Sequence, residues 1–522
     1  MAAELPPLLA WLSDALNVGV RPAPLVGIED ATAWLVDLSR FRLRLGERTP
    51  WIHLPAATAK RLGASQAKRL LDDIAIAQGW HRRNLIAQID GDGADLRVLC
   101  RVEIQPPLVL DRAAQERILA GPPNSNALIA EIGMQAPISA LAPYETSRPV
   151  LAEQFFGRER ELRQIHNNAN TSFLILGNRR MGKTSLAREA LRRASRRSPN
   201  PEALRYFDCS VFSDRNEFYA DLVRELDGPR EVGRVFADRT FSMQTFLQRV
   251  FRAKREKLML VLDEVDKLLE WDRRNGWAAV SMLRAVSNSS VALAQTDGPG
   301  ADRDERQPLR VIMAGFRLAH KCAADRDTPL FNFVTPIRVT NFDLGETEQL
   351  VLDPFLNLGL SVVDRSAVVG AIHRETGGQP NLIQHYCAYI LRRLEQSGRR
   401  DVTPELVAEA TEDSAIRERV AVELMMNSSN LEQFIVFSYL QNRWGKNGHD
   451  RFTAADADAW LEQRGAQAFR ADIEAALTAL ETTGFLIRQG RSYAFAYAGL
   501  PRALSQSYDP RYQLGKILKE DL

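Results

Sequence analysis

Short apolar runs alternate with helix-period segments through the middle of the chain. The pattern predicts strands at five apolar runs, at residues 173–176, 204–207, 258–262, 309–313 and 336–340. It predicts helices between them, the first ending at Ala194 and the others at residues 214–226, 242–256 and 276–288. Because strands interleave with helices, we expect an α/β fold over residues 149–343, with a parallel sheet wrapped by helices on both faces.

The first 120 residues carry a different pattern. Residues 1–48 predict two helices on either side of a break at Pro22 and Pro24, with apolar faces that include Trp11, Trp34 and Leu35. Residues 49–120 predict a small α+β module with strands at 51–54, 84–89 and 96–104 and a helix at 65–78. Its acidic turn, with Asp90, Asp92 and Asp95, is interpreted as a solvated turn rather than a metal site. We expect this module to be an effector or sensor domain.

Beyond residue 343 the periodicity is mainly helical. After a proline- and glycine-containing linker at 121–148 and the α/β region, residues 344–425 predict a helical lid domain. Residues 426–508 predict helices at 431–441, 454–463 and 470–481, followed by short strands at 485–488 and 493–495. Three helices and a hairpin in this order are typical of a winged helix. Residues 509–522 form a tail, and the polar segment 296–307 predicts a surface loop.

Composition limits the class of protein. A chain of 522 residues, 45% hydrophobic and 26% charged, predicts several folded domains, and a net charge of +2 exerts no strong overall field on polyanions. The four cysteines are far apart in sequence, which fits neither a zinc site nor a disulfide framework: Cys100, Cys209, Cys322 and Cys387. No run has membrane-spanning length, and the N-terminal LLAWLSDAL lacks the features of a signal peptide. We expect a cytoplasmic protein without a membrane partner.

The first strand of the α/β region runs directly into GNRRMGKT, from Gly177 to Thr184, and a helix pattern follows at once. The two glycines let backbone N–H groups converge on one anion at the positive end of the helix dipole. In loops of this pattern the lysine reaches the β- and γ-phosphates and the hydroxyl ligates Mg²⁺. A purely structural turn is the alternative, which the complete motif disfavours. The expected nucleotide-binding residues are Gly177, Asn178, Arg179, Arg180, Met181, Gly182, Lys183, Thr184 and Ser185.

An acidic pair, Asp263 and Glu264, follows the strand LMLVL. The carboxyl ends of parallel strands meet at one edge of a sheet, so Asp263 and Glu264 are expected beside the phosphate-binding loop. Asp263 is predicted to hold Mg²⁺ together with Thr184, and Glu264 to polarise the attacking water. A solvated acidic turn at the end of a strand is the alternative interpretation.

Two further positions are candidates for contact with a nucleotide. Arg317 follows the strand LRVIMAGF, where a guanidinium can sense the γ-phosphate or stabilise the charge of the transition state; a surface arginine is the alternative. Pro380 opens a helix after Gly377 and Gly378, which suits close approach of the backbone to a nucleobase and also suits a plain helix start.

Together, several segments resemble the STAND ATPases, the signalling branch of the AAA+-related P-loop proteins. They are FFGREREL, GNRRMGKTS, LVLDEVDKL, AGFR, TPLFN and TGGQPNLIQ, within residues 142–500. The resemblance implies ATP as the nucleotide, Lys183 and Thr184 at phosphate and Mg²⁺, Asp263 and Glu264 as the acidic pair, Arg317 as a sensor, Pro380 near the adenosine, and a winged helix packed on the nucleotide. The polar sensor residue usual in AAA+ proteins is missing at Ala314–Arg317.

Two functional hypotheses follow. The first is a switch in which ATP controls domain closure, protein partners or homo-oligomeric assembly, and hydrolysis resets it; bacterial relatives imply immunity or stress signalling. The alternative is a DNA-acting AAA+ ATPase resembling archaeal origin-recognition initiators. The presumptive recognition helix carries Arg470 but also Asp472, Glu474 and Glu481, which phosphates repel, so DNA is not favoured. A scaffold that does not hydrolyse ATP is disfavoured by Glu264.

Overall fold

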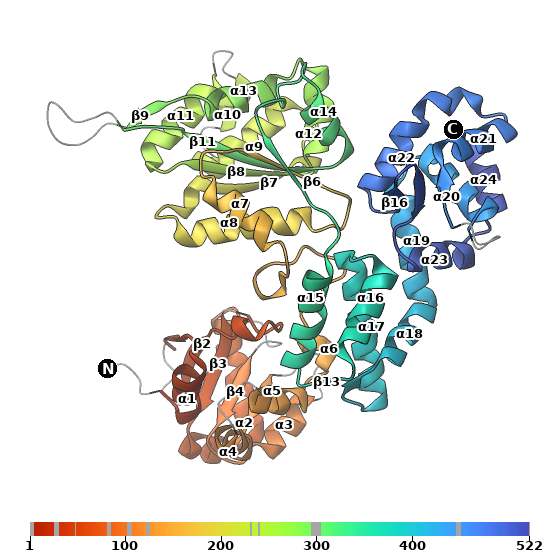
Figure 1. The fold of residues 1–522 in the computed structure, drawn as a ribbon. Coiled ribbons are helices and arrows are strands. Elements are labelled where there is room, and N and C mark those ends of the chain that lie inside the picture. Colours follow the sequence, from red (N-terminus) through yellow and green to blue (C-terminus); the bar gives the residue numbers. More distant parts are fainter. Residues whose placement is uncertain are drawn as a thin grey trace.

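The structure is a computed structural model of the 522-residue chain. It describes residues 5–25, 31–46, 48–80, 85–101, 107–121, 126–229, 232–237, 241–293, 304–444 and 450–520. Figure 1 shows four parts: an N-terminal domain in red and orange, a central domain in yellow and green, a helical domain in teal, and a C-terminal domain in blue. No helix among these residues combines the length and apolar character of a membrane span.

The N-terminal domain is built on one five-stranded sheet. Its strands lie in the order β1 (Val20–Pro22), β2 (Thr32–Val36), β3 (Thr49–Leu54), β4 (Ile86–Ile89) and β5 (Leu108–Leu110). The first two pairings are antiparallel and the last two are parallel. The helices of this domain are α1 (Pro7–Leu16), α2 (Ala56–Ala77), α3 (Ala94–Arg101), α4 (Arg112–Ala120) and α5 (Asn126–Gly133).

This sheet corrects two predictions for residues 1–48. The second predicted helix is strand β2, in which Trp34 lies opposite Trp51 of β3. The predicted boundary at residue 48 is also wrong, since β2 and β3 are neighbours in one sheet. Pairing with a strand that is distant in sequence decided the structure of a segment whose local pattern was ambiguous.

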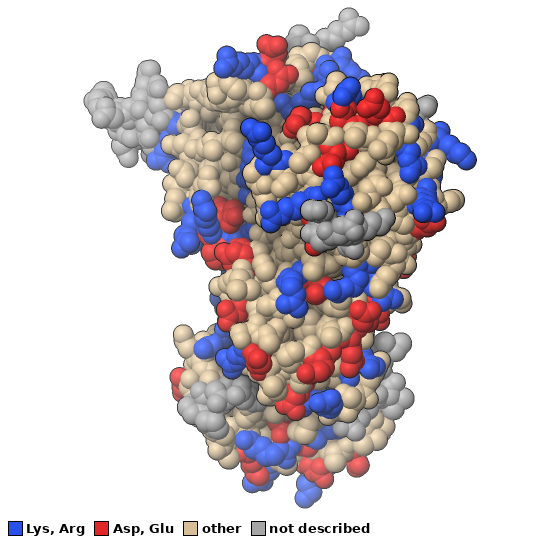
Figure 2. Space-filling view, turned by 45° about the vertical axis from the view of Figure 1, so that its right-hand side comes forward, with Lys and Arg blue, Asp and Glu red and all other residues tan. Residues whose placement is uncertain are grey.

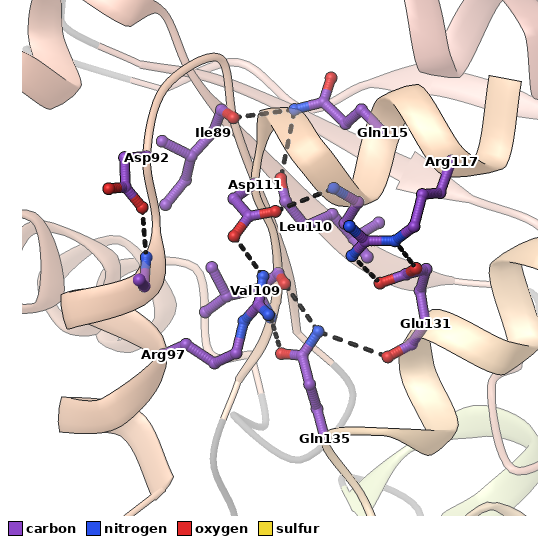
Figure 3. Close-up of polar contacts among 12 residues, drawn as sticks. Ile89, Asp92, Arg97, Val109, Leu110, Asp111, Gln115, Arg117, Glu131 and Gln135 are labelled. Carbon is purple, nitrogen blue, oxygen red and sulfur yellow. Dashed lines mark hydrogen bonds and ion pairs between the residues drawn. The ribbon is translucent and has the colours of Figure 1, made fainter. Parts of the chain in front are cut away.

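The strand predicted at 96–104 is wrong for residues 96–101, which belong to helix α3. Residues 102–104 lie outside the described residues. Leu96 and Cys100, four residues apart, are buried, whereas Val98 between them is 63% exposed, which is a helical period. Asp92 accepts a hydrogen bond from the Ala94 N–H at the start of α3, and Arg97 pairs with Asp111 after β5 (Figure 3). Helix α2 begins nine residues before the predicted Ser65 and has a kink at Gly63.

Strand β5 is the last strand of the sheet, and its unpaired edge is covered by the side chain of Gln135. The Gln135 amide accepts from the Val109 N–H at 2.8 Å and donates to the Val109 carbonyl at 2.7 Å, as a neighbouring strand would (Figure 3). This contact leaves Val109 no backbone group for pairing with another chain. Within the described residues, no group of three or more His, Cys, Asp or Glu side chains is placed to hold a metal ion.

The central domain has a parallel sheet covered by helices on both faces, as predicted. Its strand order is β12 (Thr335–Arg338), β6 (Phe173–Leu176), β11 (Leu309–Gly315), β8 (Leu258–Asp263) and β7 (Leu204–Asp208), and every pairing is parallel. The main helices are α7 (Glu159–Asn167), α8 (Lys183–Arg197), α9 (Arg215–Asp227), α10 (Val232–Ala237), α11 (Met243–Lys254), α12 (Val265–Arg274), α13 (Ala278–Ser287) and α14 (Arg317–Ala324). Strands β6, β8 and β11 are buried throughout, so they read as continuous apolar runs.

The segment predicted as a surface loop, 296–307, is partly a strand. Strand β10 (Asp304–Arg306) pairs with β9 (Val291–Leu293) in an antiparallel ribbon. Residues 296–303 of the predicted loop lie outside the described residues.

The helical domain consists of α15 (Leu344–Asn357), α16 (Arg365–Thr376), α17 (Pro380–Ser397) and α18 (Pro404–Glu412), with a small pair of strands, β13 (Ser361–Val362) and β14 (Asp401–Val402). Its apolar core is continuous with that of the N-terminal domain, through residues such as Tyr144 and Phe355, whose rings lie 5.9 Å apart. In α6 (Ile138–Leu141), Ser139 is hydrogen-bonded to Glu395 of α17. The N-terminal and helical domains therefore pack as one unit.

The C-terminal domain has its own core. It contains α19 (Ser414–Asn427), α20 (Asn430–Asn442), α21 (Ala454–Gln463), α22 (Ile473–Thr482), α23 (Gly499–Ser507) and α24 (Pro510–Lys519). Three antiparallel strands lie in the order β15 (Phe452–Thr453), β17 (Ser492–Phe495) and β16 (Leu486–Gln489). The predicted tail forms α24 as far as Lys519, and its Leu514 and Ile517 are buried.

Candidate functional site

The loop between β6 and α8 has the backbone that an anion site requires. A side chain at Gly177 would place its Cβ 2.7 Å from the Val339 carbonyl oxygen, so only glycine fits there. Gly182 has φ +86°, a conformation that favours glycine. Gly182 is the N-cap residue of the 15-residue helix α8, so no side chain at that position caps the helix. The first N–H groups of α8 have no partner within the helix and are available to an anion.

Lys183 lies inside the site. Its ammonium donates a hydrogen bond of 2.7 Å to the Asn178 carbonyl oxygen. Burial lowers the pKa of Lys183, against the opposing effect of nearby Glu264 and Asp263. An ammonium held at the start of α8 and close to two carboxylates can bridge to a phosphate.

The acidic pair lies at the same sheet edge. Asp263 ends β8 and is 3% exposed, and its carboxylate accepts hydrogen bonds from the Tyr206 hydroxyl at 2.7 Å and the Glu264 N–H at 3.0 Å. Glu264 has φ +49° as the chain turns from β8 into α12. Strands β6 and β8 flank β11, which explains how the loop and the acids come together from positions about 80 residues apart.

A cavity of about 310 Å³ joins this edge to two other parts of the chain. The loop residues from Arg179 to Ser185 and Glu264 form one wall. The linker, which in the structure continues to residue 156, forms another with residues 145–150 and 154–156. The helical domain contributes Pro380, Asn381 and Gln384 of α17. Pro380 lines the same cavity as the phosphate-binding loop, and its contact with a nucleobase stays a prediction.

Four of the predicted residues do not line this cavity: Asp263 lies at the sheet edge without lining it, and the other three face a second space. Gly177, Asn178 and Arg317 line a cleft of about 790 Å³ between the central and C-terminal domains. The Asn178 amide donates to the Thr483 carbonyl there. Ser185 lines the first cavity, but its hydroxyl accepts from the Val150 N–H at 3.0 Å and so holds the linker.

Two arginines of the site are bound to the C-terminal domain. Arg180 donates to Glu423 of α19 at 2.8 Å, and the Glu423 side chain is 1% exposed. Arg317 donates to both carboxylate oxygens of Glu432 in α20, at 2.7 and 2.5 Å, and to the Asn427 carbonyl. Arg317 therefore forms a contact between the central and C-terminal domains.

Sequence reasoning predicted the linker but not its contacts with α8 and α17. Asn381 donates to the Thr146 carbonyl at 2.9 Å, Gln384 accepts from the Glu145 N–H at 2.8 Å, and the Ala152 N–H donates to Glu189 of α8 at 3.1 Å. These contacts join residues that are 37 to 239 positions apart, which a local pattern does not reveal.

The oxygen ligands that Thr184 and Asp263 offer fit a magnesium ion bound with a nucleotide. The Thr184 hydroxyl and the Asp263 carboxylate are hard oxygen ligands, and Mg²⁺ bound with phosphates uses one or two such protein groups. Asp263 is the last residue of β8, at the sheet edge where β6 leads into the loop.

Residues 166–315 match the sequence family described as the AAA domain. With the parallel sheet and the loop geometry, this match defines the central domain as an α/β P-loop NTPase domain of the AAA+ ATPase class. No curated protein sequence matches the chain.

Several solved structures are similar to the chain at low identity. A Walker-type ATPase of Pyrococcus abyssi is 18% identical, with 70% of this chain and 99% of that chain covered and a TM-score of 0.49. The ORC2 protein of Aeropyrum pernix, in ADPNP–ADP complexes, is 12% identical, with 69% and 93% covered and a TM-score of 0.47. The RuvB Holliday junction branch migration motor of Thermotoga maritima is 14% identical, with 68% and 95% covered and a TM-score of 0.37.

Proposed function

We propose that this chain is a molecular switch of the STAND type that binds ATP and hydrolyses it. The observation that carries the proposal is the cavity in which the phosphate-binding loop, the linker and α17 meet. One ligand in this cavity touches the central domain and the unit formed by the N-terminal and helical domains. Its presence and its charge can therefore control how these parts are held together.

The residues of the site divide the chemistry of hydrolysis between them. The N–H groups of α8 and the Lys183 ammonium bind the phosphates, and Arg179 lines the same wall. Thr184 and Asp263 hold Mg²⁺, which when bound neutralises charge on the phosphate oxygens. Glu264 lines the cavity and is the base that orients the attacking water and accepts its proton.

The contacts of Arg180 and Arg317 support the switch. Both bind carboxylates of the C-terminal domain that are almost fully buried, Glu423 and Glu432. The phosphates of ATP compete with Glu423 for Arg180, which lines the cavity. A buried carboxylate that loses its partner is destabilised by about 3–5 kcal/mol, so release of Arg180 weakens the attachment of the C-terminal domain.

The rest of the chain transmits this change. The N-terminal domain moves with the helical domain because they share one core, and we assign it an effector or sensor role. A released surface binds a protein partner or a second copy of the chain in a nucleotide-dependent assembly. We propose that this signalling serves bacterial immunity or stress responses, as the STAND resemblance implies. The four described cysteines are free and buried, which fits a reducing compartment such as the cytoplasm.

The C-terminal domain is proposed to be a winged helix, with α20, α21 and α22 followed by the β16–β17 hairpin. Helix α22, in the position of a recognition helix, lines the cleft facing the central domain with Glu481, and Asp472 lines the cleft just before the helix begins. Arg470 is paired with Asp458. On the face shown in Figure 2, basic and acidic side chains are interspersed. The alternative of a DNA-acting ATPase is therefore not favoured, and a duplex affinity that falls steeply with salt would support it.

Two variants test the proposed activity. Lys183→Ala is expected to abolish binding of fluorescent ATP, because it removes the cation that contacts the phosphates. Glu264→Gln is expected to bind ATP normally and to lower phosphate release by about 100-fold or more, because the amide cannot accept the proton. Sizing the protein with ATP, with ADP and without nucleotide tests the switch. Unchanged turnover in Glu264→Gln, or one size in all three states, contradicts the corresponding part of the proposal.

A further inference from the structure

Gly377 and Gly378, between α16 and α17, are closely packed against other segments and do not line the nucleotide cavity. A Cβ on Gly377 would lie 2.7 Å from the ring of Tyr497 in the C-terminal domain. A Cβ on Gly378 would lie 2.1 Å from the Phe342 carbonyl oxygen. Both glycines have positive φ, +60° and +75°. Protein groups, rather than a nucleobase, therefore occupy the space that these glycines leave.

A third glycine brings the C-terminal domain onto α16. Gly499 is the first residue of α23, and a Cβ there would lie 2.2 Å from the Glu375 carbonyl oxygen. Beside it, the Ala498 N–H donates to the Arg374 carbonyl at 3.1 Å. Arg502 donates to the Glu375 carboxylate at 2.9 Å, and that side chain is 7% exposed. The backbones of α16 and α23 thus touch, and a hydrogen bond and an ion pair hold them.

The apolar cores of the helical and C-terminal domains are connected as well. Helix α19 follows α18 and begins the C-terminal domain (Figure 1). Its Ile416 lies in the core of the N-terminal and helical domains, and its Leu424 lies in the core of the C-terminal domain. Helix α17 likewise contributes Ile383 to the first core and Leu382 to the second. These three domains therefore pack as one body.

The central domain is joined to this body differently. Its own core is separate, and Arg180, Arg317 and Asn178 connect it to the C-terminal domain through polar groups. A cleft of about 790 Å³ lies between the two domains. Domains that meet through polar contacts around an open cleft can move relative to each other more easily than domains that share a core.

The chain passes from the central domain to the helical domain within a short segment. The Val339 N–H donates to the Leu176 carbonyl of the central sheet at 2.7 Å. The Phe342 N–H donates to the Gly378 carbonyl of the helical domain at 2.8 Å. Only two residues lie between these bonds, and Phe342 also lines the nucleotide cavity. This segment is therefore in the position of a hinge beside the nucleotide.

We propose that the N-terminal, helical and C-terminal domains turn together as one rigid body against the central domain, about the segment between Val339 and Phe342. Nucleotide sets the angle between the two bodies, because the cavity has walls from both. The C-terminal domain does not move on the helical domain, because the close contacts at Gly377 and Gly499 hold it there. This inference rests on the proposed nucleotide-driven switch and specifies which parts of it move.

Spin-label distances in the full chain test the proposal. The substitutions Ser281→Cys in α13, Gln396→Cys in α17 and Gln506→Cys in α23 replace exposed residues, one in each of the central, helical and C-terminal domains. The four native cysteines are buried, so the introduced ones take the label. Distances are measured without nucleotide, with ADP and with a non-hydrolysable ATP analogue. We expect the 281–506 distance to shift with nucleotide and the 396–506 distance to stay the same in all three states.

The two distances separate the inference from the proposed function. A nucleotide-dependent shift of the 396–506 distance overturns the rigid body and leaves the switch in place. If neither distance changes in a protein that binds nucleotide, the proposed switch is contradicted and this inference fails with it.

A variant tests whether the close contact is what fixes the domains. Gly499 has no positive φ, so Gly499→Ala acts through its contact with Glu375 alone and must move α23 away from α16. We expect the 396–506 distances to broaden and to become nucleotide-dependent. Gly515→Ala in α24 is the control, because a Cβ there meets nothing within 4 Å, and its distances should match those of the native chain. A folded Gly499→Ala with native distances contradicts the role of this contact. The native-chain measurement decides the proposal even if the variant does not fold.

Discussion

Arg180 of the phosphate-binding loop donates a hydrogen bond of 2.8 Å to Glu423, a residue 243 positions later in the chain. The carboxylate is 1% exposed, and Gln379 of the helical domain is also within hydrogen-bond distance of it, at 3.4 Å. Three domains thus meet at one buried charge. Because Arg180 also lines the candidate nucleotide cavity, this ion pair connects nucleotide binding to the position of the C-terminal domain.

Replacing Glu423 with glutamine tests this connection. Glu423→Gln keeps the side-chain volume and removes the charge that competes with phosphate for Arg180. We expect ATP affinity to rise by about tenfold, because Arg180 is then more available, a change of about 1.4 kcal/mol. Titration with fluorescent ATP measures this. Glu409→Gln, at an exposed ion pair with Arg393, is the control and should change nothing. An unchanged ATP affinity in Glu423→Gln would show that the pair is structural only.

The pair between Arg317 and Glu432 distinguishes a domain contact from a phosphate sensor. Arg317→Ala leaves Glu432 buried without its cation, so we expect the central and C-terminal domains to separate more easily in the absence of nucleotide. Small-angle scattering and limited proteolysis of the nucleotide-free protein measure this opening. A sensor role predicts the opposite result, namely an unchanged nucleotide-free protein with slower ATP hydrolysis.

Tyr206 is predicted to position Asp263. Burial and the Asp263 carboxylate raise the pKa of Tyr206, so its hydroxyl remains protonated and donates at 2.7 Å. The ring is held by the Arg188 guanidinium, 4.2 Å from its centre. Tyr206→Phe is expected to weaken Mg²⁺-dependent nucleotide binding by about 10- to 100-fold and to leave Mg²⁺-independent binding unchanged. Mg²⁺ titrations of nucleotide binding measure this, with Tyr219→Phe on α9 as the control. Loss of binding without Mg²⁺ as well would indicate a general structural role.

His385 is predicted to make the chain sensitive to acid. Burial and the nearby Arg419, Arg180 and Arg392 lower the pKa of His385 to about 4. Its ring nitrogen accepts from Arg419 at 3.1 Å, which requires a neutral imidazole. The unfolded chain binds a proton at this residue below its ordinary pKa of 6.5, while the folded chain does not. Stability is therefore lost as the pH falls from 6.5 towards 4.

His385→Gln tests this window. Glutamine keeps an acceptor for Arg419 and does not titrate, so the loss of stability between pH 6.5 and 4 should be smaller than in the native chain. The difference is expected to be at most about 3.5 kcal/mol, from a pKa change of about 2.5 at about 1.4 kcal/mol per pH unit. Urea titrations at several pH values measure it. Parallel pH profiles for the two proteins would assign the acid sensitivity to other groups.

Comparison of the N-terminal and central domains shows where sequence reasoning succeeds. Strands β6, β8 and β11 are buried on both faces and read as apolar runs, so their local pattern has one interpretation. Leu96, Val98 and Cys100 satisfy a strand period and, through Leu96 and Cys100, a helix period as well. Packing of α3 against α2, which follows from the tertiary fold, selects the helix.

The sequence by itself determined the parallel sheet of the central domain, the loop from Gly177 to Thr184 and the acidic pair. The loop and the acidic pair each depend on residues within about ten positions, and the sheet follows from buried apolar runs that alternate with helix-period segments. Only the tertiary structure decided that Arg317 binds Glu432, that Gln384 holds the linker, and that residues 1–48 complete a sheet. These contacts join segments that are distant in the chain, and their free energy depends on burial and on the partner's position, which a local pattern does not contain.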